Sequence, residues 1–173
     1  MKQMIVGLLL ISAVAAQEVT KEPVTGVRNF ARLGTTVACA GATAADAVPE
    51  IRKMGFVSIV NLRLATEAGA EVEKEEAAAK AAGLRYFHVP FDGKPNAEAA
   101  NTFLEAITTP GAEPAFIHCA GGNRAATMWL IKRLVVDGWD QERAVKEAVA
   151  LGQTSEPLRT WAIEYAATRK KDR

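Results

Sequence analysis

The segment FIHCAGGNRA, residues 116–125, decides the fold. Its apolar start is typical of a buried strand, and the two glycines that follow allow backbone conformations that other residues rarely adopt. Arg124 then leads into an apolar stretch that predicts a helix over 125–136. A strand, a glycine loop and a helix N-terminus in this order favour anion binding, because loop N–H groups and the helix dipole both present positive potential.

The rest of the chain repeats this alternation of strands and helices. Strands are predicted over 35–40, 56–62, 84–89 and 115–118, and helices over 46–55, 67–82, 96–108, 125–136, 140–152 and 157–167, with Asp46 and Asp140 as N-caps. The pattern predicts an α/β fold of three layers, in which a mostly parallel sheet of four to five strands is flanked by helices. Ligands bind beyond the carboxyl ends of such strands, so we expect the site at that edge.

Composition limits the function. The 173 residues fit one domain, with 49% apolar and 24% charged residues. Lys and Arg number 21 against 20 Asp and Glu, so no basic field favours nucleic acid as a partner. Two Cys and two His are too few for a Cys/His-rich zinc site or a disulfide framework. We therefore expect no metal and no cofactor.

The N-terminus has the pattern of a secretory signal peptide. Lys2 is followed by an uncharged apolar run over 5–15, and Ala13 and Ala15 are the small residues that precede a cleavage point. The run is shorter than the ~20 residues of a membrane-spanning helix. A buried N-terminal helix or an uncleaved anchor is the other interpretation.

These features predict the domain organisation. We expect a signal peptide over 1–16, a leader over 17–28, a single domain over 29–168 and a tail over 169–173. The mature protein is then exported, periplasmic or secreted, without stable insertion in a membrane. Loss of Lys2 leaves basic and acidic side chains equal in number.

The residues of the loop suggest a division of chemical roles. Cys119 at a helix N-terminus and near a cation loses its proton easily and becomes a nucleophile. Arg124 can hold two oxygens of an oxyanion with its planar guanidinium. The main chain of Ala120, Gly121, Gly122 and Asn123 is expected to bind the same anion, and His118 to support the thiolate from behind.

His118, Cys119 and Arg124 resemble the signature of the cysteine-dependent protein phosphatases of the tyrosine and dual-specificity types. The resemblance to these phosphatases extends over residues 29–150. The segment GFVSIVNLR, residues 55–63, resembles a small bacterial group that occurs alone or fused to metallo-β-lactamase-type hydrolases. The resemblance implies a cysteine-phosphatase-like fold and a phosphorylated protein or small phosphate ester as substrate. It also implies that Cys119 attacks phosphorus, that Arg124 binds the oxygens and that Asp92 protonates the leaving oxygen.

Two departures from the phosphatase pattern leave alternatives open. Four residues separate Cys119 from Arg124 where these phosphatases have five, and residue 125 is Ala where they usually carry Ser or Thr. The shorter spacing resembles rhodanese-type sulfurtransferases, in which a persulfide would form on Cys119. A loop that binds an anion without turning it over, as in a pseudophosphatase, is the third hypothesis.

Two further residues have two interpretations each. Cys39 ends a predicted strand near the site, and is either a small buried residue or the partner of Cys119 in a disulfide formed under oxidising conditions. Arg63 follows the next strand, and either reaches the site or forms a structural ion pair.

Overall fold

A computed structural model of the chain describes residues 18–171, and it contains one six-stranded sheet. The strands are β1 (Val19–Lys21), β2 (Ala31–Leu33), β3 (Val37–Ala40), β4 (Ser58–Asn61), β5 (Arg85–His88) and β6 (Ala115–His118). Their order across the sheet is β1-β2-β3-β6-β4-β5. The last four in this order run parallel, whereas β1 and β2 are antiparallel to their neighbours. The strand that carries the loop of interest, β6, is therefore central.

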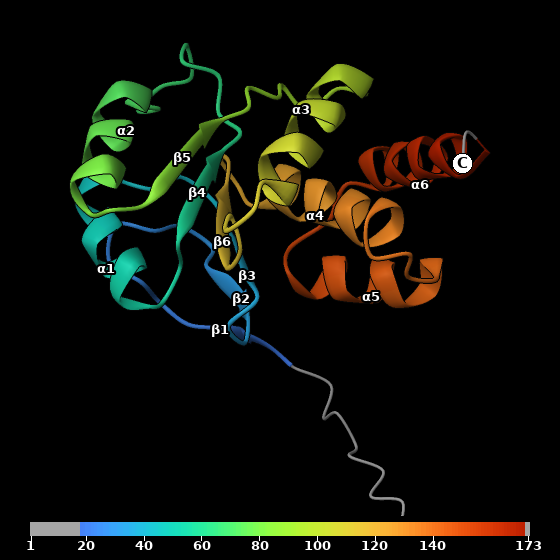
Figure 1. Cartoon of the computed structure of the whole chain (residues 1–173), viewed down its shortest axis with the longest axis horizontal. Coiled ribbons are helices and arrows are strands. Elements are labelled where there is room, and N and C mark those ends of the chain that lie inside the picture. The colour runs from blue at the N-terminus through green and yellow to red at the C-terminus, as the bar shows by residue number, and fades with distance from the viewer. Residues whose placement is uncertain (1–17, 172–173) are drawn as a thin grey trace, which may run out of the picture.

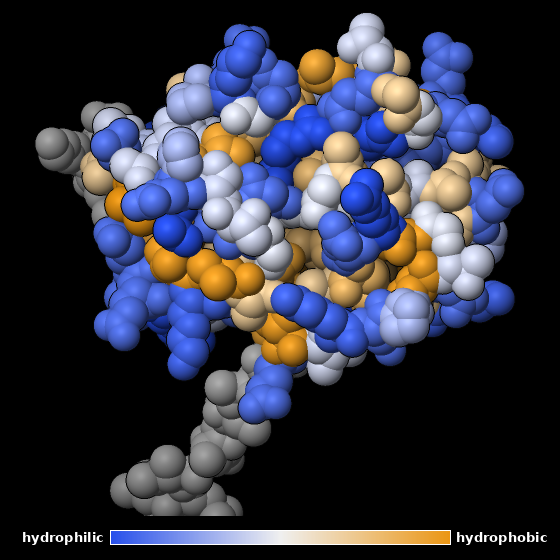
Figure 2. All heavy atoms as spheres, turned by 180° about the vertical axis from the view of Figure 1, so that it is seen from behind, coloured by the Kyte–Doolittle hydropathy of each residue, from blue (hydrophilic) through white to orange (hydrophobic). Residues whose placement is uncertain are grey.

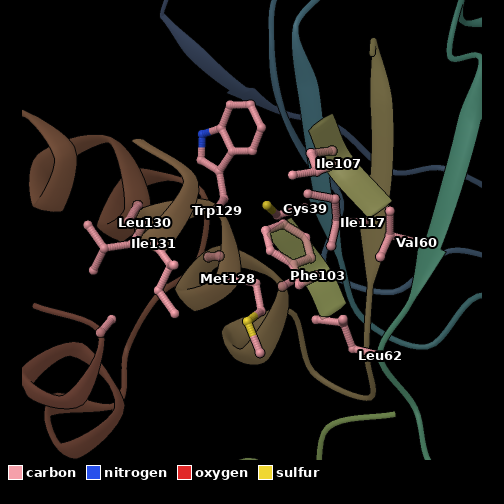
Figure 3. Close-up of a cluster of buried hydrophobic side chains, with 14 of the residues drawn as sticks. Cys39, Val60, Leu62, Phe103, Ile107, Ile117, Met128, Trp129, Leu130 and Ile131 are labelled. Carbon is pink, nitrogen blue, oxygen red and sulfur yellow. The ribbon is translucent and has the colours of Figure 1, made fainter. Parts of the chain in front are cut away.

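Helices cover both faces of the sheet, as Figure 1 shows. They are α1 (Val48–Lys53), α2 (Val72–Ala81), α3 (Ala97–Thr108), α4 (Asn123–Val135), α5 (Gln141–Ala150) and α6 (Glu156–Lys171). The first two lie on one face and the other four on the opposite face. The larger buried cluster lies under α3, α4 and α6, and Figure 3 shows Phe103, Ile117 and Trp129 packed together there. Burial of such large apolar side chains is the main stabilising contribution to the fold.

The expected α/β class with a mostly parallel sheet is confirmed, and β3 to β6 fall within the four predicted strands. The sheet has six strands rather than four or five because β1 and β2 add an antiparallel pair at one edge. Strand β1 lies in the segment expected to be a leader. It is three residues long and largely exposed, so it has no apolar alternation that would have marked it. The predicted signal peptide over 1–16 lies outside the described residues.

Three predicted helix boundaries are corrected. Asp46 does not cap α1, because it lies inside a 3₁₀ turn (Ala45–Ala47) and the helix begins at Val48 without a side-chain cap. Helix α2 begins at residue 72 rather than 67. Helix α6 continues to residue 171, beyond the predicted end at 167 and into the expected tail. The cap of α5 matches the prediction, since Asp140 accepts a backbone N–H, and Asn96, which was not predicted as a cap, caps α3 in the same way.

Polar and charged side chains cover much of the face shown in Figure 2, with apolar side chains between them. Within residues 18–171, none of the helices combines the length and the apolar character that crossing a bilayer needs.

Candidate active site

Cys119 lies at the carboxyl end of β6, one residue beyond the strand. Its N–H donates to the carbonyl of Ala40 (3.1 Å), and the carbonyl of His118 accepts from the N–H of Leu62 (2.9 Å). The ends of β3 and β4 therefore hold Cys119 from both sides. Only 1% of the residue is exposed, which places it at the bottom of the loop.

The carbonyls of the loop point away from the sulfur. The carbonyl of Ala120 accepts from the N–H of Ala42 (3.0 Å), and that of Gly121 accepts from Asn29 Nδ2 (3.0 Å). In a planar trans peptide the N–H points opposite to the carbonyl, so the N–H groups of Gly121 and Gly122 point the other way. Consistent with this, the Gly122 N–H donates to Sγ of Cys119 (3.1 Å). The loop is thus a partial ring of donors around the sulfur.

Gly122 makes this geometry possible and also begins the next helix. Its φ is +98°, in the left-handed region that side chains strongly disfavour. It is the N-cap of α4, whose dipole adds positive potential beside Cys119. The loop therefore combines a left-handed glycine with a helix N-terminus next to Cys119.

Arg124 is held by oxygen atoms at one end of its guanidinium. Nη1 donates to Oε1 of Glu67 (2.7 Å), to the carbonyl of Leu62 (3.3 Å) and to the carbonyl of Phe91, and Nη2 donates to Oε2 of Glu67 (2.8 Å). The oxygen acceptors that the structure gives for Arg124 in residues 18–171 all lie on Nη1 and Nη2, and the guanidinium also contacts the Cys119 side chain. Burial lowers the pKa of Arg124, but Glu67 and the neighbouring Cys119 together raise it above its usual value.

Glu67 is a site residue that the sequence reasoning missed, because its Ala-, Glu- and Lys-rich surroundings predicted a surface helix. The hydrogen bonds with Arg124, followed by that with the Leu64 N–H, lower its pKa to about 2 despite partial burial. Arg63 contacts Glu67 (3.4 Å) and donates to the carbonyls of Ala68 and Gly69, both at 2.6 Å. Arg63 is therefore structural: it holds the loop that carries Glu67.

Asp92 follows β5 on the same edge of the sheet, in a loop that passes over Arg124. A Cβ built on Gly93 would meet Cδ of Arg124 at 3.5 Å. The Asp92 carboxylate accepts from the N–H of Lys94 (2.9 Å), and its side chain is 40% exposed. These contacts with Lys94 lower its pKa. Asp92 is thus beside the site, ionised and turned toward Lys94.

His118 faces the opposite side of the sheet from Cys119, because successive side chains of a strand alternate. Its Nε2 lies 3.1 Å from the carboxylate of Glu75, which is itself 1% exposed. The same Glu75 oxygen accepts from Asn61 Nδ2 (2.7 Å) and from the Tyr86 hydroxyl (2.9 Å). His118 is therefore joined to Cys119 through the backbone alone, and the three residues around it were not expected from the sequence.

The remaining predicted residues have structural contacts. Oδ1 of Asn123 accepts from the N–H groups of Thr154 (2.7 Å) and Ser155 (2.9 Å), so its side chain ties the loop before α6 to the start of α4. Ala125 is fully buried. The Thr127 hydroxyl donates to the Asn123 carbonyl (2.9 Å) and is one helical turn away from the loop.

Cys39 is a free, fully buried thiol, as is Cys119, so the two form no disulfide in this structure. Figure 3 shows Cys39 among apolar side chains, including Ile117 and Phe103. Burial, reinforced by the neighbouring Cys119, raises the pKa of Cys39 well above its usual value. The interpretation of Cys39 as a small buried residue is confirmed.

Among residues 18–171 there is no group of three or more His, Cys, Asp or Glu placed to hold a metal ion. The site instead offers a thiol, a set of backbone donors and a guanidinium. Together these groups can bind a small oxyanion and bring a nucleophile against its central atom.

Comparison with protein families gives a match over residues 29–135 to the "Beta-lactamase hydrolase-like protein, phosphatase-like domain". A curated relative, the beta-lactamase hydrolase-like protein of Agrobacterium fabrum, is 29% identical over 118 residues. The aligned region covers 67% of this chain but 27% of the relative, so the chain corresponds to about a quarter of that protein.

Solved structures share the fold. A DUF442 protein of Shewanella putrefaciens superposes with a TM-score of 0.68 at 16% identity, covering 84% of this chain and 96% of the other. TpbA of P. aeruginosa in complex with phosphotyrosine superposes with a TM-score of 0.64 at 19% identity, covering 93% and 94%. At these identities the likeness extends to the fold alone.

Proposed function

The chain belongs to the phosphatase-like domain family of beta-lactamase hydrolase-like proteins, and from this membership and the site geometry we propose that it is a cysteine-dependent phosphatase that hydrolyses a phosphate monoester. One observation carries the proposal: the Arg124 guanidinium and the Gly122 N–H both contact the Cys119 side chain. The substrate class is a phosphorylated protein or a small phosphate ester.

Binding uses groups that are held before the substrate arrives. Glu67 fixes the guanidinium end-on, so Nε and the second N–H of Nη2 can donate to two phosphate oxygens. The loop N–H groups and the N-terminus of α4 stabilise the remaining negative charge. Little reorganisation is then needed at the moment of reaction.

The chemical step is a displacement at phosphorus. The Cys119 thiolate forms a P–S bond while the P–O bond to the leaving group breaks, and protonated Asp92 gives its proton to the leaving oxygen. Water then attacks the phosphocysteine, Asp92 takes a proton from that water, and the thiolate leaves with release of inorganic phosphate. This role requires Asp92 to turn from Lys94 toward the substrate, where loss of the Lys94 contacts and the negative charge of the phosphate would raise its pKa and favour the protonated form.

The decisive assay is hydrolysis of an aryl phosphate by the purified residues 17–173. We expect turnover by the unaltered protein, a loss of about a thousandfold or more in Cys119→Ser, and a loss of about a hundredfold in Asp92→Asn. Lys94→Gln is the matched control for Asp92, since it removes the ion pair and leaves the acid. Turnover that survives Cys119→Ser would contradict the proposal.

A second candidate function is sulfur transfer, which the four-residue spacing, Ala125 and the ionised Asp92 favour. The Cys119 thiolate would take the outer sulfur of thiosulfate with release of sulfite, and pass it from the persulfide to cyanide as thiocyanate. This reaction needs no general acid, so Asp92→Asn should leave it intact. Phosphate binding with neither reaction would indicate an anion-binding protein.

Export is part of the proposal and rests on residues 1–16. Expression of the full chain in a bacterium with an oxidising periplasm should yield, in the periplasmic fraction, a protein whose first residue is 16 or 17. A protein that keeps Met1 and stays in the cytosol would contradict export without affecting the assays above.

A further inference from the structure

A buried carboxyl group links three of the four parallel strands behind the site. Glu75 of α2 is 1% exposed and lies against β4, β5 and β6 at once. One of its oxygens, Oε2, accepts from Asn61, Tyr86 and His118, one residue from each strand. The contact of His118 is made by Nε2, which lies 3.1 Å from both oxygens of the Glu75 carboxyl group.

This cluster is costly for a purely structural device. Within residues 18–171, the buried side-chain polar atoms without a hydrogen-bond partner are Nδ1 of His118 and Oε1 of Glu75, although Oε1 also lies 3.1 Å from Nε2 of His118. The free-energy cost of burying a carboxyl group must be offset by its hydrogen bonds, and a polar cluster with unsatisfied atoms is often less stabilising than apolar packing. The apolar neighbours of His118 on this face, such as Phe116 at 5.8 Å between ring centres, show that an apolar packing is available there.

Two of the three partners of Glu75, His118 and Asn61, lead directly to parts of the site. His118 precedes Cys119. Oδ1 of Asn61 accepts from the N–H of Arg63 (2.8 Å), at the start of the loop that carries Glu67. The carbonyl of Asn61 accepts from the N–H of Val89 (2.9 Å), where β5 leads to Asp92.

We propose that Glu75 is a positioning residue of the site, which acts through His118 to fix the main chain that carries Cys119. The inference rests on the proposed phosphatase only for its turnover measurement. Glu75 touches neither the substrate nor the sulfur, and its effect is on how accurately the nucleophile faces the phosphorus. A displacement of about 1 Å at a reacting atom can cost about a hundredfold in rate.

The test compares Glu75→Gln with Glu76→Gln, which changes the exposed neighbour on the same helix. For Glu75→Gln we expect kcat for p-nitrophenyl phosphate to fall about tenfold, and KM to stay within about twofold of the unaltered protein. Here kcat is calculated from the concentration of protein whose Cys119 can be alkylated. The rate of Cys119 alkylation by iodoacetamide, followed by peptide mass mapping, should change about threefold or more. Glu76→Gln should match the unaltered protein in all three.

Coupling separates positioning from general destabilisation. If Glu75 acts through His118, the further effect of Glu75→Gln on kcat and on alkylation should largely disappear in a His118→Asn background. An equal effect in both backgrounds, or values within twofold of the unaltered protein, would overturn the inference.

Two contingencies keep the test decisive. If Glu75→Gln does not fold, Tyr86→Phe is the second variant, because it removes one donor and leaves the Glu75 carboxyl group and His118 in place. Its kcat and its alkylation rate should each differ about threefold from those of the unaltered protein. Unchanged values of both would count against the inference. If the unaltered protein hydrolyses no aryl phosphate, the proposed function fails, and the alkylation rates and their coupling alone decide the role of Glu75.

Discussion

At the scale of single residues, the two loop glycines differ in what they contribute. Gly122 has φ of +98°, whereas Gly121 is outside the left-handed region and a Cβ there would meet nothing within 4 Å. Gly122→Ala should cost roughly 1–2 kcal/mol of unfolding free energy and weaken phosphate binding, because the strained loop relaxes by turning its N–H groups. Urea denaturation and phosphate titration measure both effects, with Gly121→Ala as the control for stability. Equal losses in the two variants would contradict this.

Cys119 and Arg124 could be predicted from the sequence because their spacing lies within one short segment that also contains the strand, the loop and the helix start. Glu67 could not be predicted. Its role depends on Arg63, which tethers the main chain at residues 68 and 69, and on the return of Arg124 from a segment 57 residues later. Composition predicts local conformation, whereas this contact exists only once the sheet has assembled.

At the scale of elements, one side chain joins the start of α4 to the loop before α6. We expect Asn123→Ala to lower the unfolding free energy by about 1 kcal/mol and the affinity for phosphate, since two backbone N–H groups lose their acceptor beside the site. Asn123→Asp keeps Oδ1 and should retain most of the stability. Thermal denaturation checks the ranking, and an Asp variant as unstable as the Ala variant would refute it.

The boundary of α2 shows where prediction of elements from composition fails. Helix propensity over 67–82 is high throughout, yet the first five residues are a loop because their carbonyls and Glu67 bind Arg63 and Arg124. The strands β3, β4 and β6 were predictable because they are buried on both faces and form short, mostly apolar runs. Strand β5 is the parallel edge strand and is partly exposed, and it was predictable from the apolar and aromatic residues of 84–89. Strands β1 and β2 pair at the sheet edge mainly through the backbone, which leaves little trace in the sequence.

At the scale of the whole molecule, the Glu67–Arg124 pair makes folding stability depend on pH in the acid range. The folded pKa of Glu67 is about 2, below its usual 4.5. A lowered pKa stabilises the folded protein above the unfolded value, and this stabilisation is lost as the pH falls from about 4.5 toward 2. The pair joins the loop after β4 to α4, so its loss loosens the edge of the sheet that carries the site.

At pH 6, Glu67→Gln should therefore unfold at a lower urea concentration than the unaltered protein. Its free energy of unfolding should be lower by about 1 kcal/mol, which is the scale of a partly exposed ion pair. The difference should shrink as the pH is lowered to 3, because the unaltered protein then begins to lose what the variant never had. Glu71→Gln is the matched control, because it removes an exposed ion pair with Lys74. Its stability should follow that of the unaltered protein at both pH values. A difference that stays constant between pH 6 and pH 3 would mean that Glu67 acts by shape alone, and that Arg124 is held without the charge on its partner.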